Sequence, residues 1–236
     1  MLRRLLKSVQ NVAEKVKDPL STEPFVVFEF KSAQDAARWR VSSDSTFGGL
    51  SSGTIQVAES QGASTVGRFS GMYSKGIGPN AHPKLKKSGF VSMTGRTDSL
   101  SPYIDLESYQ SLIYRVKGDG RTYLANLRTD NWVTGGDGNS EDIWQAVLLS
   151  KDDGGCDSGW KDVEIPLTSF VLTWKGRVVD APVELGKTKV TALGISLLGN
   201  DEQAEGPFCI EIESIKARHE LDAASSITHP DEKEAS

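Results

Sequence analysis

The sequence has few cysteines, few histidines and no long hydrophobic run, and each shortage narrows what the chain can be. Its two cysteines, Cys156 and Cys209, are too few for a disulfide scaffold in 236 residues, which favours free thiols in a reducing compartment. None of the three histidines has a partner histidine at metal-ligand spacing. No apolar run approaches the ~20 residues that a membrane-spanning helix requires.

Motifs for nucleotide chemistry are incomplete as well. Gly76-Ile-Gly78 and Gly118-Asp-Gly120 begin like phosphate-binding loops, but neither completes a GxGxxG pattern, so we interpret both as β-turns. Neither cysteine has a histidine nearby in the sequence. We therefore predict that the chain is not an enzyme and carries no cofactor. An unrecognised enzyme on the same scaffold is the least favoured alternative, which fold alone does not exclude.

Charge is unevenly distributed along a chain whose formal net charge is -5. Residues 1–17 carry five basic side chains against Glu14, and residues 220–236 carry five acidic side chains against Lys233. The acidic middle contains no basic stripe and would repel phosphate backbones. Nucleic acid is therefore excluded as an expected partner.

The first residues have the pattern of a short basic amphipathic helix. Apolar side chains recur at helical spacing between Leu2 and Val16, with basic side chains off that stripe. Such a helix can target an organelle, lie on an anionic membrane surface, or dock on its own domain. We favour targeting or membrane contact. The residues predicted to contact a membrane are Leu2, Arg3, Arg4, Leu5, Leu6 and Lys7.

Beyond this helix and its linker (1–23), the chain alternates apolar and polar residues with a period of two. The pattern predicts half-buried strands around residues 112–116, 123–127, 143–149, 163–167, 193–197 and 208–212, with glycine-rich turns between them. In the strand at 143–149 the side chains of Ile143, Gln145, Val147 and Leu149 are assigned to one face. Residues 24–219 are therefore predicted to form an all-β jelly-roll sandwich, preceded by the short helix and followed by a disordered acidic tail (220–236).

Binding residues are expected in loops at strand ends. The loops at 43–52, 130–142 and 174–177 are rich in Gly, Asn, Asp and Trp, a composition typical of binding loops. The candidate partner-binding residues are Ser43, Asp44, Asp130, Asn131, Trp132, Trp174 and Arg177. The glycines there are better explained by tight turns. The acidic run at 137–142 could ligate a structural calcium ion, or it is simply a solvated turn.

Motifs in a fixed order along residues 25–217 give the chain a family resemblance. They are Ser43-Asp44, Gly48-Gly49-x-Ser51, Phe69-Ser-Gly71, Ser88-Gly-Phe90, Ile104-Asp-Leu106, Gly118-Asp-Gly-Arg121, Asp130-Asn-Trp132, Trp144-Gln145, Ile165-Pro-Leu167, Thr173-Trp-x-Gly176, Phe208-x-Ile-Glu-Ile212 and Ile215-Lys-Ala217. In this set the chain resembles the complex I intermediate-associated protein 30 family, the mitochondrial assembly factors for NADH:ubiquinone oxidoreductase.

The resemblance implies a galactose-binding-like jelly roll and a chaperone role. The expected partners are an early membrane-arm assembly intermediate of complex I and other assembly factors. The expected location is the mitochondrial matrix or the matrix face of the inner membrane, with a plastid less favoured. The family supplies no catalytic residues. The alternative function is a carbohydrate-binding module, because a jelly roll with exposed tryptophans can stack on sugars.

Overall fold

Alternating apolar residues form antiparallel strands in the structure. The computed structural model describes residues 24–61, 63–83, 85, 87–96, 102–130, 133–134, 141–149, 159–197 and 205–219. The predicted N-terminal helix (1–23) and acidic tail (220–236) lie outside the described residues. No helix among the described residues is both long and apolar enough to cross a membrane.

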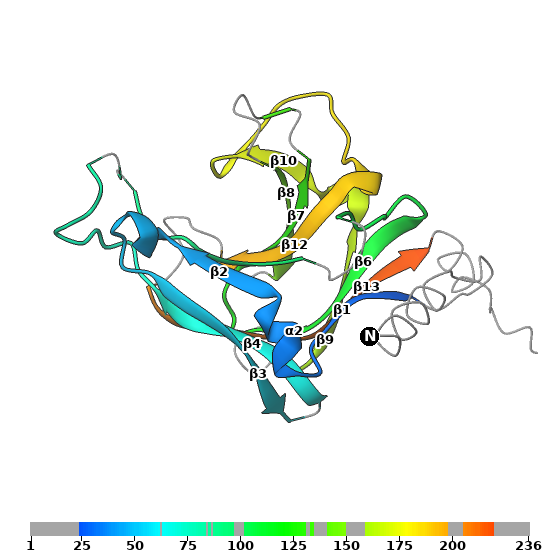
Figure 1. Ribbon diagram of the computed structural model, residues 1–236, viewed down its shortest axis with the longest axis horizontal. Coiled ribbons are helices and arrows are strands. Elements are labelled where there is room, and N and C mark those ends of the chain that lie inside the picture. Colours follow the sequence, from blue (N-terminus) through cyan, green and yellow to red (C-terminus); the bar gives the residue numbers. More distant parts are fainter. Residues whose placement is uncertain are drawn as a thin grey trace, which may run out of the picture.

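The strands belong to two antiparallel sheets, which Figure 1 shows packed as two layers. The strands are β1 (Phe25–Glu29), β2 (Trp39–Ser43), β3 (Ser52–Ser60), β4 (Ala63–Tyr73), β5 (Val91–Gly95), β6 (Tyr109–Lys117), β7 (Tyr123–Thr129), β8 (Asp142–Leu149), β9 (Lys161–Pro166), β10 (Val171–Trp174), β11 (Arg177–Val178), β12 (Val190–Leu197) and β13 (Gly206–His219). The short helices are α2 (Ala33–Ala37), η1 (Asp44–Phe47), η3 (Leu167–Ser169) and η4 (Lys187–Lys189).

Strand order follows a jelly-roll pattern in which strands distant in sequence become neighbours. The six-stranded sheet has the order β3-β4-β13-β6-β9, with β1 also paired to β13, and the seven-stranded sheet has the order β11-β10-β8-β7-β12-β5-β2. The inner faces of both sheets meet in one apolar core. Tyr114 of β6, Ile210 of β13 and Ile195 of β12 are completely buried there. The predicted fold class is confirmed.

In strand β8 the side chains that are buried differ from those that the sequence predicted. Its side chains at Trp144 and Leu148 point into the core and are buried, while Val147 on the other face is 58% exposed. Both faces of this segment are rich in apolar residues, so the period of two did not show which face would be buried. The prediction that Ile143, Gln145, Val147 and Leu149 share one face is therefore wrong. The first three lie on the outer face of the sheet, whereas Leu149 lies in the core beyond an irregularity in the pairing with β7.

The seven-stranded sheet curls between β2 and β10, as Figure 1 shows. At its centre β12 is buried along its whole length, and its outward residues are small: Ala192, Gly194 and Ser196. A Cβ atom on Gly194 would stand only 2.9 Å from the carbonyl oxygen of Met93. The outer face of the sheet is therefore shallow along β12, where the side chains are small, and is bordered by larger side chains at both margins.

Candidate functional site

The outer face of the seven-stranded sheet carries a continuous row of side chains across its strands. The row is formed by paired residues on neighbouring strands: Arg40 of β2, Thr94 of β5, Gly194 of β12, Asn126 of β7, Gln145 of β8 and Val171 of β10. Directly paired residues in antiparallel strands have side chains on the same face, about 5 Å apart. The row therefore links a basic end at β2 to an apolar end at β10.

A hydrogen-bonded group of side chains occupies the middle of this row. The amide of Gln145 donates to Oδ1 of Asn126 at 2.8 Å, and the amide of Asn126 donates to Oγ of Ser196 at 3.1 Å. Asn126 and Ser196 are buried, so these bonds satisfy polar groups that water reaches poorly. The group fixes the side-chain orientations at the floor of the face.

An apolar groove of about 680 Å³ lies at the β10 end of the face. Leu124 and Val147 are at its floor, Phe47 and Phe90 line one wall, and the β10–β11 hairpin lines the other. Phe47 is 60% exposed and Val178 of the hairpin is 69% exposed. Large apolar side chains gathered on a soluble surface mark interaction sites.

The first wall is held in place by the buried carboxylate of Asp44. Its Oδ1 accepts the backbone N–H of Ser51 at 2.9 Å, and its Oδ2 accepts the hydroxyl of Ser51 at 2.9 Å and the N–H of Phe90 at 3.0 Å. The N–H of Gly89 donates to the same oxygen. These bonds tie helix η1, which carries Phe47, to the segment that carries Phe90.

The second wall is a tight hairpin. Lys175 has φ 51° and Gly176 has φ 76°, which is the pair of left-handed residues that a type I′ turn requires. The turn joins β10 to β11 and sets Val171 and Val178 beside the groove. The ammonium of Lys175 lies 5.1 Å from the ring centroid of Trp174, which is 39% exposed.

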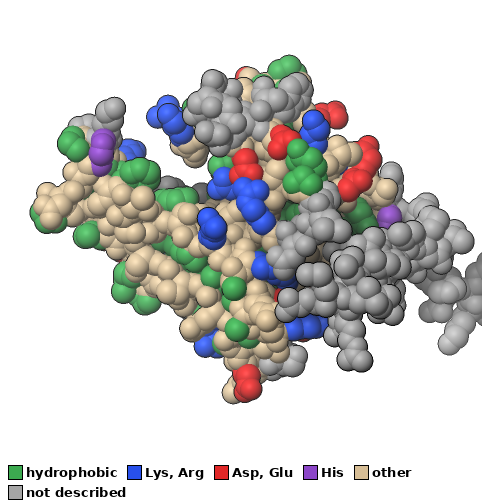
Figure 2. All heavy atoms as spheres, viewed as in Figure 1, with side chains coloured by type: hydrophobic (Ala, Val, Ile, Leu, Met, Phe, Trp, Pro, Cys, Tyr) green, Lys and Arg blue, Asp and Glu red, His purple; other side chains and the backbone are tan. Residues whose placement is uncertain are grey.

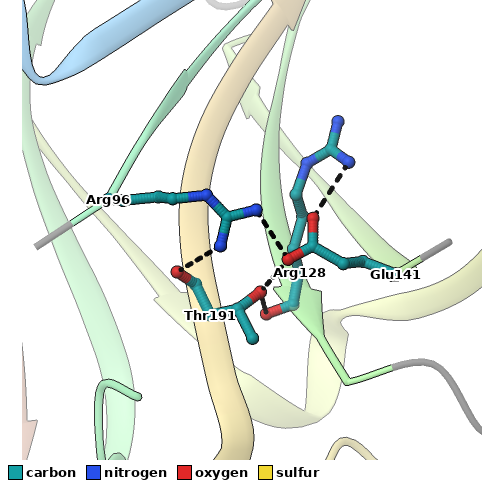
Figure 3. A network of polar contacts seen from close by, with 4 residues as sticks. All are labelled: Arg96, Arg128, Glu141 and Thr191. Atoms are coloured by element: carbon teal, nitrogen blue, oxygen red, sulfur yellow. Dashed lines mark hydrogen bonds and ion pairs between the residues drawn. The ribbon is translucent and has the colours of Figure 1, made fainter. Parts of the chain in front are cut away.

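At the opposite end, arginines surround one carboxylate in a second hollow, which we call the arginine pocket. It contains Arg38, Arg40, Arg96, Arg128 and Glu141. Arg96 donates to Glu141 at 2.8 Å, Arg128 donates to it at 3.4 Å, and the hydroxyl of Thr191 donates to it at 2.6 Å (Figure 3). Basic side chains gather near the middle of the view in Figure 2.

Competing effects set the charge state of Glu141. Burial alone would raise the pKa of this carboxyl group, but the Thr191 hydrogen bond and the guanidinium groups of Arg96 and Arg128 outweigh it. The pKa of Glu141 therefore lies below its ordinary value, and the group is an anion at neutral pH. It holds two of the four arginines of the pocket in fixed positions.

The predicted site residues fall in different places. Two of the three predicted loops meet at the groove, through Asp44 and Phe47 on one side and Lys175 and Gly176 on the other. Asp44 is buried and its carboxylate accepts hydrogen bonds within the fold, and Ser43 is half-buried beside it. Arg177 is exposed on the hairpin. Partner binding by these loops stays a prediction.

The third predicted loop is described only in part. Asn131 and Trp132 lie outside the described residues, and Asp130 accepts a hydrogen bond from the hydroxyl of Tyr103 at 2.5 Å. Its last residue, Asp142, is completely buried and accepts the N–H of Thr134 at 3.0 Å. The described part of the chain holds no group of three or more His, Cys, Asp and Glu side chains suited to a metal ion. The calcium hypothesis also concerns residues 137–140, which are not described, and it stays untested.

Sequence reasoning missed the arginine pocket. Its members are spread over Arg38 to Glu141, and only strand pairing brings them together. The one local signal was the alternation of Arg38 and Arg40 around buried Trp39. Arg121 contacts groups within the fold, since its guanidinium lies 3.6 Å from Asp119 and donates to the carbonyl of Pro207 at 3.1 Å.

Comparison with known proteins places the chain in a family. The family profile described as complex I intermediate-associated protein 30 matches residues 28–212, which is most of the sandwich. The chain belongs to the complex I intermediate-associated protein 30 family. Among its relatives, the protein of this name from Drosophila melanogaster, described as mitochondrial, is 29% identical over 91% of this chain and 72% of its own length. The mouse and Neurospora crassa proteins of the same name are 27% and 24% identical, over 80% and 88% of this chain and 55% and 78% of their own lengths.

Solved structures with a similar fold are carbohydrate-binding modules. The family 11 module of a Clostridium thermocellum cellulase superposes with a TM-score of 0.58 and 13% identity, covering 84% of this chain and 96% of the module. A family 30 module of the same organism gives a TM-score of 0.52 and 15% identity, covering 84% of this chain and 98% of the module. At these identities the likeness establishes the jelly-roll fold alone.

Proposed function

We propose that this chain is an assembly factor for mitochondrial respiratory complex I that binds an early membrane-arm intermediate through protein–protein contact. The observation that carries the proposal is the family match over residues 28–212, together with relatives that are named complex I intermediate-associated proteins. Under this proposal the chain acts by holding a partner, and no catalytic step is involved.

The apolar groove supports a binding role. Phe47, Phe90 and Val147 are each more than two-fifths exposed, although they are large apolar side chains on one continuous surface. A partner side chain that enters the groove would remove this area from water, which is the main source of affinity in protein interfaces. We therefore place the partner-binding surface on the curved face of the seven-stranded sheet.

The expected compartment is the mitochondrial matrix or the matrix face of the inner membrane, and the expected neighbours include other assembly factors. The names of the relatives support a mitochondrial location. The basic residues of the N-terminal segment, Arg3, Arg4 and Lys7, would be attracted to anionic headgroups of that membrane.

The direct test is native-gel complexome profiling of mitochondria that contain the full chain with a C-terminal tag. We expect the tagged chain to co-migrate with a subassembly of complex I and to be absent from the mature enzyme. Migration as a free monomer only, together with an unchanged complex I level after deletion of the protein, would exclude the proposal.

The alternative of sugar binding has its own measurement. Calorimetric titration of the purified chain with a β-1,3-1,4-linked tetrasaccharide, of the kind seen bound to a family 11 module, should give no heat of binding if the curved face serves a protein partner. A saturable titration that a Val147→Asp change abolishes would instead assign the groove to sugar.

A further inference from the structure

Among the described residues, the arginine pocket contains more arginines than carboxylates that pair with them. Four arginines stand against two carboxylates, because Asp35 pairs with Arg38 at 2.5 Å and Glu141 serves both Arg96 and Arg128. Arg40 is exposed and has no ion-pair partner among the described residues. The side chain of Arg96 is 58% exposed, so one of the paired guanidinium groups is also open to a ligand.

The strands set where these arginines stand, and hydrogen bonds hold the guanidinium groups of Arg96 and Arg128. Arg40 stands on β2, Arg96 follows β5, and Arg128 is on β7, where it pairs with Ala192 of β12. Glu141 and the carbonyl oxygen of Thr191 accept the two ends of the Arg96 guanidinium, at 2.8 and 3.4 Å. A planar guanidinium held in this way can donate two parallel hydrogen bonds from its remaining N–H groups to the two oxygens of a carboxylate.

The pocket and the apolar groove belong to one surface. Arg40 and Val171 are the two ends of the same row of paired residues, five strand spacings apart, which is about 24 Å. Between them the floor is low, because Gly194 has no side chain and Asn126 and Ser196 are tied to each other. An extended peptide of about seven residues is long enough to cross this distance.

We propose that the curved face binds one extended segment of a protein partner, which places acidic side chains in the arginine pocket and apolar side chains in the groove. This inference rests on the proposed function and specifies the chemistry of the partner. The charge excess of the pocket calls for an anion, and the exposed apolar side chains at the other end call for a hydrophobic group on the same ligand.

A peptide fits this face better than other anionic ligands do. A bilayer presents a flat array of headgroups, whereas this sheet is curved (Figure 1). Its arginine pocket is separated from the apolar groove by the polar side chains of Asn126 and Gln145. A free phosphate would fill the arginine pocket but leave the groove unused. A peptide with acidic side chains at one end and apolar side chains at the other satisfies both ends.

Charge reversal at Arg40 tests the acidic half of the proposal. In the complexome experiment, Arg40→Glu should reduce the fraction of the chain that co-migrates with the subassembly by about tenfold or more, because like charges would meet in the pocket. Arg40→Lys should keep most of the binding, since it keeps the charge and loses only the paired hydrogen bonds of the guanidinium group. The matched control is Lys216→Glu, which makes the same charge change on the six-stranded sheet.

Photo-crosslinking tests whether one segment spans the face. A photoreactive residue at exposed Ser42, beside the arginine pocket, or at Val147, in the groove, would be introduced into the full chain. We expect both sites to crosslink to the same partner segment, at positions about seven residues or fewer apart, with Asp or Glu at the Ser42 end. Crosslinks to two unrelated proteins would overturn the proposal.

Two further outcomes separate the inference from the proposed function. If Arg40→Glu co-migrates as the wild type does, the inference fails while the assembly role stands, and if the wild type itself does not co-migrate, the assembly role fails. Vesicles of phosphatidylcholine with phosphatidylglycerol test the lipid alternative. Flotation with these vesicles that Arg40→Glu abolishes, with co-migration unchanged, would assign the pocket to headgroups and contradict the peptide.

Discussion

At the scale of single residues, the buried carboxylate of Asp44 joins the two segments that form one wall of the apolar groove. Only 4% of its surface is exposed, and its two oxygens accept hydrogen bonds from Ser51, Gly89 and Phe90. A buried carboxylate is costly unless donors surround it, and here backbone N–H groups from two segments do so. The residue therefore holds two loops together as one wall of the groove.

Replacing Asp44 with asparagine should destabilise the fold by about 3 kcal/mol, because the amide carries two donors toward groups that are themselves donors. Urea unfolding followed by tryptophan fluorescence measures this loss. Asp180→Asn, at an exposed position, is the control and should change the free energy of unfolding by less than about 0.5 kcal/mol. Equal stability of the two variants would contradict the structural role of Asp44.

Glu141 gives a pH dependence with a defined sign. Its folded-state pKa lies below the ordinary value of 4.5, so the ionised carboxylate stabilises the fold fully above about pH 4.5. That contribution is lost as the pH falls through the folded-state pKa. We expect the wild type to exceed Glu141→Gln in unfolding free energy by about 1 kcal/mol at pH 7, a modest figure because Arg96 is largely exposed.

The measurement is a series of urea titrations of both proteins between pH 7 and pH 3. Taking the difference between the two removes the contributions of Glu211 and Asp35, whose pKa values are also lowered. The difference should shrink only at the acidic end of the series. A difference that is constant over the whole range would contradict an ionised Glu141 as the centre of the arginine pocket.

At the scale of elements, the β10–β11 hairpin determines the second wall. Lys175 adopts a left-handed backbone at φ 51°, which is unfavourable for most side chains. Asparagine tolerates this conformation well and is favoured before glycine in type I′ turns. The backbone of Lys175 is therefore slightly strained, and a different residue at this position would relieve the strain.

Lys175→Asn should therefore raise the free energy of unfolding by about 0.5 kcal/mol, because it removes the backbone strain and leaves Gly176 in place. Thermal unfolding by circular dichroism measures the change as a higher midpoint. Lys175→Ala removes the same ammonium group without the preference for a left-handed backbone and should give no gain. A gain of the same size in both variants would show that charge, and not turn conformation, was responsible.

The sequence predicted the buried face of some strands correctly and that of others incorrectly. Strands with one apolar face, such as β6 and β13, were predicted correctly because alternation is unambiguous when the other face is polar. Strand β8 was turned around because Trp144 and Val147 are both apolar and lie on opposite faces. The choice between them depends on the neighbouring strands, and a single segment does not contain that information.

At the scale of the whole molecule, the candidate site is a product of strand order. The loops around Asp44 and Lys175 were predicted as binding loops from composition, and the structure brings them together across one groove. The arginine pocket was not predicted, because β5, β12, β7 and β2 become neighbours only through long-range pairing. Local pattern predicts elements, whereas a surface built from several strands requires the fold.

The proposal that the curved face binds a complex I intermediate also belongs to the scale of the whole molecule. The measurement that tests it most directly is the amount of mature complex I in cells that lack this protein and express Val147→Asp or Val147→Thr at equal levels. Threonine keeps the branched shape of valine, whereas aspartate places a charge in the apolar groove. We predict that Val147→Thr restores complex I to the wild-type level and that Val147→Asp does not. Full restoration by Val147→Asp, or normal complex I in the cells without the protein, would contradict the account.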